Sequence, residues 1–238
     1  MDLRDKVVVL TGAGRGAGRS IALALAEEGT RLVLASRTVS ELNAVRDEVK
    51  ATGAQVIAIP TDVGDPQQVE TLAQETLGAF GTVDVIINNA GWCPPLRLVQ
   101  DTTLEDWNLA MNINARGPFL LIKALLPTML AKRSGQIINV SSDVARGGCA
   151  TASAYGASKI ALIGLGEALL DEVAEYGIRV TNLVPGTMNT DQRWDDDPDF
   201  PRETVMEPED FAQLVVSLMK LEDYVLIKEV GVRPIVQD

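Results

Sequence analysis

The stretch VVVLTGAGRGAG at residues 7–18 joins a short apolar run to a turn that contains four glycines. The apolar residues 7–10 predict a buried strand, and the alanine-rich residues 20–28 after the turn predict a helix. Small residues between a strand and a helix let the backbone approach phosphate groups, and the helix N-terminus offers those groups unpaired N–H donors. The stretch therefore predicts a turn that binds the pyrophosphate of a dinucleotide, with these candidate contacts: Gly12, Arg15, Gly16, Ala17 and Gly18.

The same alternation of short apolar strands and helices continues along the chain. Further strands are predicted at residues 31–35, 56–59, 83–87, 136–140 and 178–184, and helices at 39–51, 65–79, 102–130, 153–176 and from 207 onward. Pro118 is expected to break or bend the helix that contains it. Alternating strands and helices are typical of a parallel sheet covered on both faces. We therefore expect an α/β fold with a doubly wound Rossmann-type sheet, mostly parallel and seven-stranded.

No shift in composition marks a linker, and no internal repeat is found, so residues 1–238 are expected to form one domain. Its cofactor half is expected at about 1–130, and its catalytic and substrate half at about 131–238. Residues 187–207 interrupt the alternation with prolines and an acidic run. A loop of this length in a compact domain is typically functional or disordered, and we predict a lid there.

Composition excludes several classes of function. The chain has no histidine, which rules out Ser-His-Asp triads, histidine acid–base catalysis and histidine-ligated metals. Cys93 and Cys149 are too few for a disulfide framework or a cysteine metal cluster, so no metal site is predicted. A net charge of −12 disfavours nucleic acid and anionic membrane surfaces. No apolar run approaches the ~18 residues of a membrane span, and no signal-peptide pattern is present, so we expect a cytoplasmic protein with a small-molecule substrate.

The end of the second predicted strand indicates which dinucleotide is bound. NAD sites place an Asp or Glu about 20 residues after the glycine turn, where it binds the ribose 2′-hydroxyl. Here Ser36 and Arg37 occupy that place. A hydroxyl and a guanidinium suit a 2′-phosphate, which a carboxylate would repel. Because Arg15 in the glycine turn is placed to reach the same phosphate, NADP(H) is predicted rather than NAD(H).

Tyr155 and Lys159, in YGASK at residues 155–159, are four positions apart in a predicted helix and share one face. A tyrosine hydroxyl has a pKa near ~10, and a neighbouring cation lowers that pKa. Taken alone, such a pair is more often two surface neighbours. Beside a dinucleotide-binding turn, and in a chain without histidine, Tyr155 becomes the natural candidate for proton transfer near neutral pH.

Three motifs, TGAGRGAG at 11–18, NNAG at 88–91 and YGASK, together resemble the short-chain dehydrogenases/reductases, in that family's order and spacing. The resemblance covers about residues 5–219 and implies an oxidoreductase that interconverts a ketone or aldehyde and an alcohol. It also implies four catalytic residues: Asn114, Ser142, Tyr155 and Lys159. Ser142 ends the fifth predicted strand thirteen residues before Tyr155, and Asn114 is a better match than Asn112.

In the mechanism that the resemblance implies for reduction, Tyr155 protonates the developing alkoxide and Ser142 holds the carbonyl oxygen. Lys159 binds the ribose, and Asn114 carries a water that links Lys159 to solvent. The resemblance also implies that Tyr155 contacts the cofactor, together with further residues: Asp62 and Val63 at the adenine, Asn89, Ala90 and Gly91 after the fourth strand, and Pro185, Gly186 and Thr187 beside the nicotinamide, with Thr190 at a common threonine position. Trp92, Cys149 and Trp194 are expected to form apolar pocket walls.

The chain end, EVGVRPIVQD, lacks the family's usual glycine-rich ending and is similar to NADP-dependent enzymes acting on 3-hydroxy acids and serine-like alcohols. A homo-oligomer, dimer or tetramer, is expected through the helices at 102–130 and 153–176. Two alternatives stay open. One is a 3-oxoacyl thioester reductase, whose acidic carrier would dock on a basic patch to which Arg116, Arg133 and Arg146 could contribute. The other is a non-catalytic NADP-binding sensor.

Overall fold

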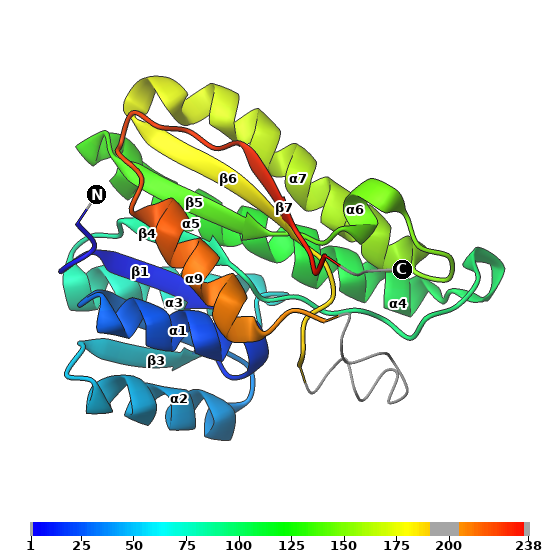
Figure 1. Cartoon of the computed structure of the whole chain (residues 1–238), viewed down its shortest axis with the longest axis horizontal. Coiled ribbons are helices and arrows are strands. Elements are labelled where there is room, and N and C mark those ends of the chain that lie inside the picture. The colour runs from blue at the N-terminus through cyan, green and yellow to red at the C-terminus, as the bar shows by residue number, and fades with distance from the viewer. Residues whose placement is uncertain (1, 191–204, 236–238) are drawn as a thin grey trace.

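The computed structural model describes residues 2–190 and 205–235, in which seven strands form one parallel sheet (Figure 1). The strands are β1 (Val7–Thr11), β2 (Arg31–Ser36), β3 (Val56–Pro60), β4 (Val85–Asn88), β5 (Gly135–Val140), β6 (Ile178–Pro185) and β7 (Glu229–Val232). Their order in the sheet is β3-β2-β1-β4-β5-β6-β7. Strands β2 and β3 therefore lie on one side of β1 and strands β4 to β7 on the other, and the strand order reverses between β1 and β4. The predicted doubly wound, seven-stranded fold is confirmed. Most of the predicted lid, residues 191–204, lies outside the described residues, as does Trp194.

Helices cover both faces of the sheet. One face carries α1 (Gly16–Glu27), α2 (Val39–Ala51) and α9 (Pro208–Met219), and the other carries α3 (Pro66–Phe80), α5 (Gly117–Lys132) and α7 (Ser153–Val173). Strand β1 shows why the strands are apolar throughout: Val8 and Leu10 pack in the first layer, while Val7 and Val9 pack in the second. No helix in the described part of the chain is both long and apolar enough to cross a membrane.

The glycine turn is shorter than the sequence predicts. Helix α1 begins at Gly16, not at Ser20, so the last two glycines of the motif lie in its first turn. Glycine is unfavourable in a helix interior, which is why the residue pattern indicates a longer turn. Gly12 and Gly16 have φ values of +67° and +51°, a left-handed backbone that glycine adopts without strain.

The helix predicted at 102–130 is divided into α4 (Leu104–Met111), the π-helical segment η2 (Asn112–Arg116) and α5. The N–H of Gly117 donates to the carbonyl of Asn112, five residues back. Pro118 lies at the start of α5, so the interruption precedes this proline. The short elements are η1 (Val99–Asp101), α6 (Val144–Gly147) and η3 (Ala174–Tyr176).

Buried asparagines fix α7 against the sheet. The Nδ2 of Asn88 donates to Oδ1 of Asn139 at 2.9 Å, and the Nδ2 of Asn139 donates to Oδ1 of Asn182 at 3.1 Å. Asn182 in turn donates to the carbonyl of Ile163 on α7 at 3.3 Å. This asparagine ladder runs across β4, β5 and β6 below Gly166, whose missing side chain lets α7 approach. The sheet thereby holds the helix that carries Tyr155 and Lys159.

Candidate active site

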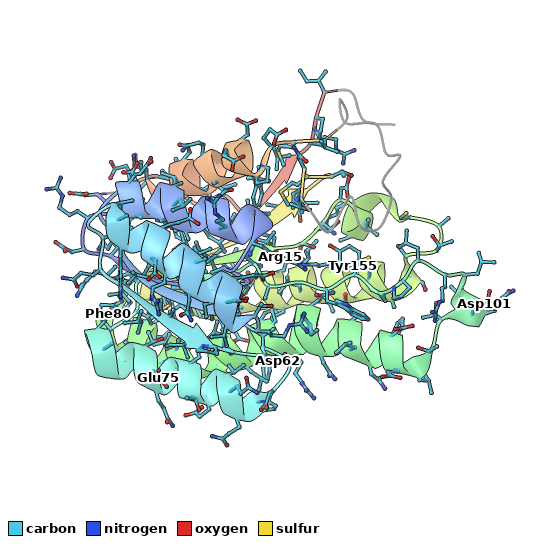
Figure 2. All side chains as sticks on the ribbon, turned by 90° about the horizontal axis from the view of Figure 1, so that it is seen from below. Arg15, Asp62, Glu75, Phe80, Asp101 and Tyr155 are labelled. Carbon is cyan, nitrogen blue, oxygen red and sulfur yellow. The ribbon has the colours of Figure 1, made fainter. Side chains whose placement is uncertain are left out.

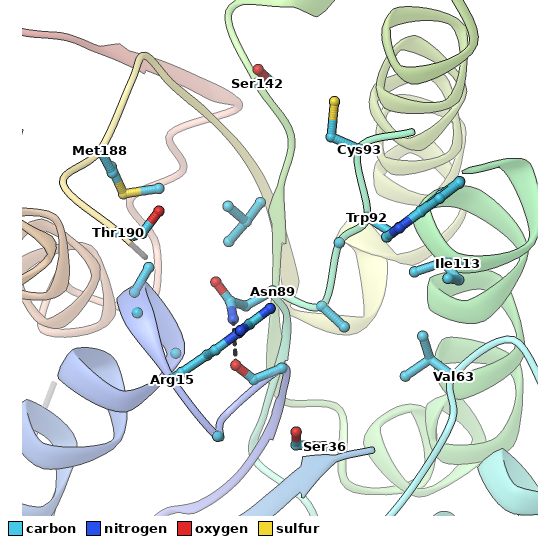
Figure 3. A pocket seen from close by; sticks show the side chains of 18 of the residues that line it. Arg15, Ser36, Val63, Asn89, Trp92, Cys93, Ile113, Ser142, Met188 and Thr190 are labelled. Atoms are coloured by element: carbon cyan, nitrogen blue, oxygen red, sulfur yellow. Dashed lines mark hydrogen bonds between the residues drawn. The ribbon is translucent and has the colours of Figure 1, made fainter. Parts of the chain in front are cut away.

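A cavity of about 330 Å³ opens at the carboxyl ends of the strands, where the strand order reverses. Figure 2 shows Arg15, Asp62 and Tyr155 at this end of the strands, opposite to Phe80. Figure 3 shows the cavity itself, with Ser36 at one end and Ser142 and Cys93 at the other. It is lined by the glycine turn, the end of β2, the segment after β4, the end of β5, α7 and the segment after β6.

The segment after β4 holds the glycine turn in shape. Asn89 donates from Nδ2 to the carbonyls of Thr11 and Gly12, at 3.0 and 3.2 Å. The hydroxyl of Thr11 accepts from the N–H groups of Asn89 and Ala90, both at 3.1 Å. These contacts pair the carbonyls of Thr11 and Gly12 and fix the turn against the segment after β4.

The turn has the features of a phosphate site. A Cβ added at Gly12 would lie 2.8 Å from the Cα of Ala90, and one added at Gly18 would overlap the carbonyl oxygen of Gly12, so neither position accepts a side chain. Helix α1 has no side-chain hydrogen bond at its N-cap, Arg15, and no acidic residue in its first turn. Its N-terminal N–H groups and the positive end of its dipole therefore face the cavity without a competing carboxylate from the helix itself.

The three predicted contacts of the 2′-phosphate, Arg15, Ser36 and Arg37, all line the cavity. Glu41 on α2 lines it as well, and its Oε1 lies 4.0 Å from Nη1 of Arg15. Arg37 is exposed and makes no ion pair within residues 2–190 and 205–235. The two guanidinium groups are thus placed to meet an anion.

Tyr155 and Lys159 meet in the cavity, with the ammonium of Lys159 5.8 Å from the centre of the Tyr155 ring. The ammonium donates to the carbonyl of Val140 at 2.8 Å, and burial lowers the pKa of Lys159 to about 8. Burial raises the pKa of Tyr155, and the Ser142 hydroxyl beside it acts in the opposite direction. The predicted lowering of the Tyr155 pKa is therefore wrong in this structure, since desolvation outweighs the lysine that is turned toward Val140.

The two serines of NVSSD have different roles in the structure. Ser141 donates from its hydroxyl to the backbone carbonyl of Lys159 at 3.0 Å, which ties β5 to α7. Ser142 lies at the cavity wall beside Tyr155, and its contacts to the carboxylate of Asp143 and from the N–H of Val144 are long, both 3.4 Å. The Ser142 hydroxyl can therefore turn toward a substrate at small energetic cost.

Asn114 is fully buried in η2 and does not line the cavity. Its Oδ1 accepts from the N–H of Trp92, and its Nδ2 donates to the carbonyl of Trp92, both at 2.8 Å. The same Nδ2 donates to Oγ of Ser158 on α7 at 2.9 Å. The Asn114 side chain therefore fixes the cavity wall after β4 against α7, a pairing across the fold that sequence spacing does not reveal.

Most of the predicted site residues line the cavity, and the exceptions are Asp62, Asn114 and Thr187. Asp62 accepts from the N–H of Gly64 at 2.9 Å, and the neighbouring Asp65 caps α3. Of the predicted walls, Trp92 lines the cavity, whereas Cys149 is exposed outside it. Sequence reasoning did not assign these further lining residues: Gly14, Thr38, Glu41, Thr61, Cys93, Ile113, Val140, Ser141 and Met188. In the described part of the chain, no three Cys, Asp or Glu residues gather as metal ligands.

A doubly wound sheet with a glycine-rich turn at its switch point, facing a tyrosine and a lysine, defines a dinucleotide-binding Rossmann protein. The profile of the family described as short chain dehydrogenase matches residues 6–199. An uncharacterized oxidoreductase of Staphylococcus aureus (strain MRSA252) is 33% identical over 233 residues, which cover 98% of this chain and 99% of the relative. The chain is therefore an oxidoreductase that belongs to the short-chain dehydrogenase family.

Solved structures agree with this assignment. The alcohol dehydrogenase of the archaeon Thermococcus sibiricus, complexed with 5-hydroxy-NADP, superimposes with a TM-score of 0.91 at 29% identity, covering 99% of each chain. An NAD⁺-bound xylitol dehydrogenase superimposes with a TM-score of 0.91 at 25% identity, covering 98% of this chain and 100% of that one. The fold is therefore shared by proteins solved with either type of dinucleotide.

Proposed function

We propose that the protein is an NADP(H)-dependent oxidoreductase that interconverts a ketone or aldehyde and an alcohol, with Ser142, Tyr155, Lys159 and Asn114 as its catalytic set. The observation that carries this proposal is the position of Tyr155, Lys159 and Ser142 in the same cavity as the glycine turn. A dinucleotide fits that cavity because its wall includes the glycine turn and the start of α1, where N-terminal N–H groups can bind a pyrophosphate. The nicotinamide supplies or accepts the hydride when it is bound.

The residues that line the cavity have separate roles in the proposed reaction. The Tyr155 hydroxyl lies in the cavity and would donate a proton to a developing alkoxide, although burial, which raises its pKa, makes it a weaker acid in this structure. The Ser142 hydroxyl donates to Asp143 only over a long distance, 3.4 Å, and would turn to donate to the same oxygen and hold it in place. With a pKa of about 8, Lys159 keeps its positive charge near neutral pH. Its ammonium lies close to Gly91, where a Cβ would approach Nζ to 3.2 Å, and it is placed to bind ribose hydroxyls.

Asn114 would act through its backbone carbonyl. Both N–H donors of its side chain and one acceptor site of its Oδ1 are used by Trp92 and Ser158, which favours the backbone as the group that holds a water. Pro118 has no N–H, so the Asn114 carbonyl lacks the donor that an α-helix supplies four residues later. This carbonyl is the group that we assign to the water connecting Lys159 with solvent.

The NADP(H) preference rests on Arg15, Ser36 and Arg37, which line one end of the cavity. We expect Arg37→Asp to weaken NADPH binding by at least ~10-fold and to leave NADH binding little changed, because the new carboxylate repels a 2′-phosphate only. Fluorescence titration with both cofactors measures this ratio. An equal loss for NADPH and NADH would contradict the assignment of Arg37 to the phosphate.

The substrate class can be tested directly. The purified protein is mixed with NADPH and a panel of ketones, aldehydes, 3-oxo acids and acyl thioesters, and nicotinamide oxidation is followed by absorbance. We expect turnover with a small ketone or aldehyde. Oxidation with none of the panel, despite NADPH binding, would favour the non-catalytic sensor over the enzyme.

The thioester alternative loses support at the arginines proposed to dock an acidic carrier. Arg146 is paired with Glu229 and lies 3.7 Å from Glu167. Arg133 donates to the carbonyl of Glu175, and Arg116 to the carbonyl of Gly64. Because each guanidinium already has a partner within its own chain, a carrier would have to compete for it.

A homo-oligomer is proposed through α4, α5 and α7. These helices expose large apolar side chains, namely Leu104 (79% exposed), Phe119 (46%) and Ile160 (52%). Large apolar surface of this kind is typical of protein interfaces. We expect a dimer or tetramer at micromolar concentration in sedimentation velocity, and Leu104→Glu with Ile160→Glu to shift it toward monomer. A monomeric wild-type protein would contradict the proposal.

A further inference from the structure

We propose that Glu41 sets how strongly this protein prefers NADP(H) over NAD(H), by placing a carboxylate beside the site of the 2′-phosphate. The inference rests on the proposed function, because it assumes that the end of the cavity near Ser36 receives the adenosine ribose. Glu41 belongs to the first turn of α2 and lines the same cavity as Arg15, Ser36 and Arg37.

The surroundings of Gly14 show where the Glu41 carboxylate lies. A Cβ added at Gly14 would approach Oγ of Ser36 to 2.9 Å and Oε2 of Glu41 to 3.3 Å. The serine hydroxyl and the carboxylate therefore flank one point beside the glycine turn. Figure 3 shows Ser36 and Arg15 at this end of the cavity. A phosphate that binds Ser36 would consequently have Glu41 as a near neighbour.

The charges at this end are not uniformly positive. The Glu41 carboxylate lies 4.0 Å from the guanidinium of Arg15, and the two side chains are 36% and 56% exposed. An exposed pair at this distance contributes little free energy, so Arg15 can turn to a phosphate without a large loss. The carboxylate stays nearby when Arg15 turns. A 2′-phosphate would then meet two guanidinium groups and one negative charge.

That negative charge acts differently on the two cofactors. A dianionic 2′-phosphate is repelled by Glu41, whereas a ribose 2′-hydroxyl is not and can donate to a carboxylate. Glu41 therefore reduces the preference for NADP(H) over NAD(H) that Arg15 and Arg37 create. Glu41 also stabilises the N-terminus of α2 as an acidic first-turn residue. Glu41→Gln removes the charge and keeps a side chain of similar size and hydrogen-bonding capacity.

Helix α2 offers a matched control at Glu48. Glu48 is also paired with an arginine of α1, Arg19, but it does not line the cavity. Glu48→Gln changes the net charge by the same amount as Glu41→Gln and also breaks an ion pair to α1, one that is closer and hydrogen-bonded. Any effect of overall charge on nucleotide binding is therefore common to both variants, and only a local effect at the phosphate distinguishes them.

The experiment measures dissociation constants of 2′,5′-ADP and 5′-AMP by calorimetry for the wild type, E41Q and E48Q, at low and high salt. We expect E41Q to bind 2′,5′-ADP about 3- to 10-fold more tightly than the wild type at low salt, as for one partly exposed charge. Binding of 5′-AMP should be unchanged, the gain should shrink at high salt, and E48Q should match the wild type. Circular dichroism spectra are compared with that of the wild type to check that both variants are folded.

Two results would overturn the inference. Equal behaviour of E41Q and E48Q would show that the carboxylate has no local effect, and weaker binding of 2′,5′-ADP to E41Q would show that Glu41 aligns Arg15 for the phosphate. The wild-type preference between the two nucleotides tests the proposed NADP(H) specificity. The change in that preference in E41Q tests Glu41, so each of the two proposals can fail without the other.

Discussion

Tyr155→Phe is expected to lower turnover by at least ~10²-fold, the usual contribution of a positioned general acid. The substitution removes only the hydroxyl, the group that would donate the proton. The ring of Tyr155 stays beside Lys159, and the glycine turn is untouched, so NADPH binding should change little. Initial rates with whichever carbonyl compound the protein reduces, and a fluorescence titration with NADPH, measure the two effects separately.

Tyr176→Phe is the matched control. The Tyr176 ring packs under the guanidinium of Arg133, 5.0 Å away, and lies outside the cavity. We expect this variant to keep near-normal turnover. If Tyr155→Phe also kept near-normal turnover, the proton would have to come from another group and the proposed mechanism would be wrong. If Tyr155→Phe lost NADPH binding as well, the loss of turnover would be explained by cofactor binding and would not be evidence for proton transfer.

The parts of the site that depend on local sequence could be predicted. The four glycines between a strand and a helix, and the spacing of Tyr155 and Lys159, place their groups through backbone periodicity alone. The same holds for Ser36 and Arg37, because they follow a strand whose carboxyl end must reach the ligand crevice. In each case the neighbouring residues in sequence determine where the side chain lies.

The parts that depend on contacts between distant segments could not be predicted. Asn114 holds the backbone of Trp92, twenty-two residues away, and this pairing has no signal in either segment. Glu41 lines the cavity from α2, where its side chain lies beside Gly14 of the glycine turn. The pKa of Tyr155 follows from burial, which depends on the whole fold and overrides the effect expected from Lys159. The only sequence signal for Glu41 was its position, four residues after Arg37.

Gly166→Ala is expected to destabilise the protein by about 2–4 kcal/mol, from overpacking and disturbed buried hydrogen bonds. A Cβ at this position would overlap Oδ1 of Asn182 and lie 2.8 Å from Nδ2 of Asn139. Both atoms belong to the buried asparagine ladder and are hydrogen-bonded to each other, so neither can move away freely. Chemical denaturation followed by circular dichroism measures the free energy of unfolding.

Gly164→Ala, two residues away on the same helix, separates this steric effect from helix propensity. A Cβ at Gly164 meets nothing within 4 Å, so alanine should leave stability unchanged or raise it by about 0.5–1 kcal/mol through lower chain entropy in the unfolded state. Because the ladder positions α7, Gly166→Ala should also displace Tyr155 and Lys159 and lower turnover in the fraction that stays folded, whereas Gly164→Ala should not. Equal stability of the two variants would show that the asparagines yield, and that contacts other than the ladder hold the catalytic helix in place.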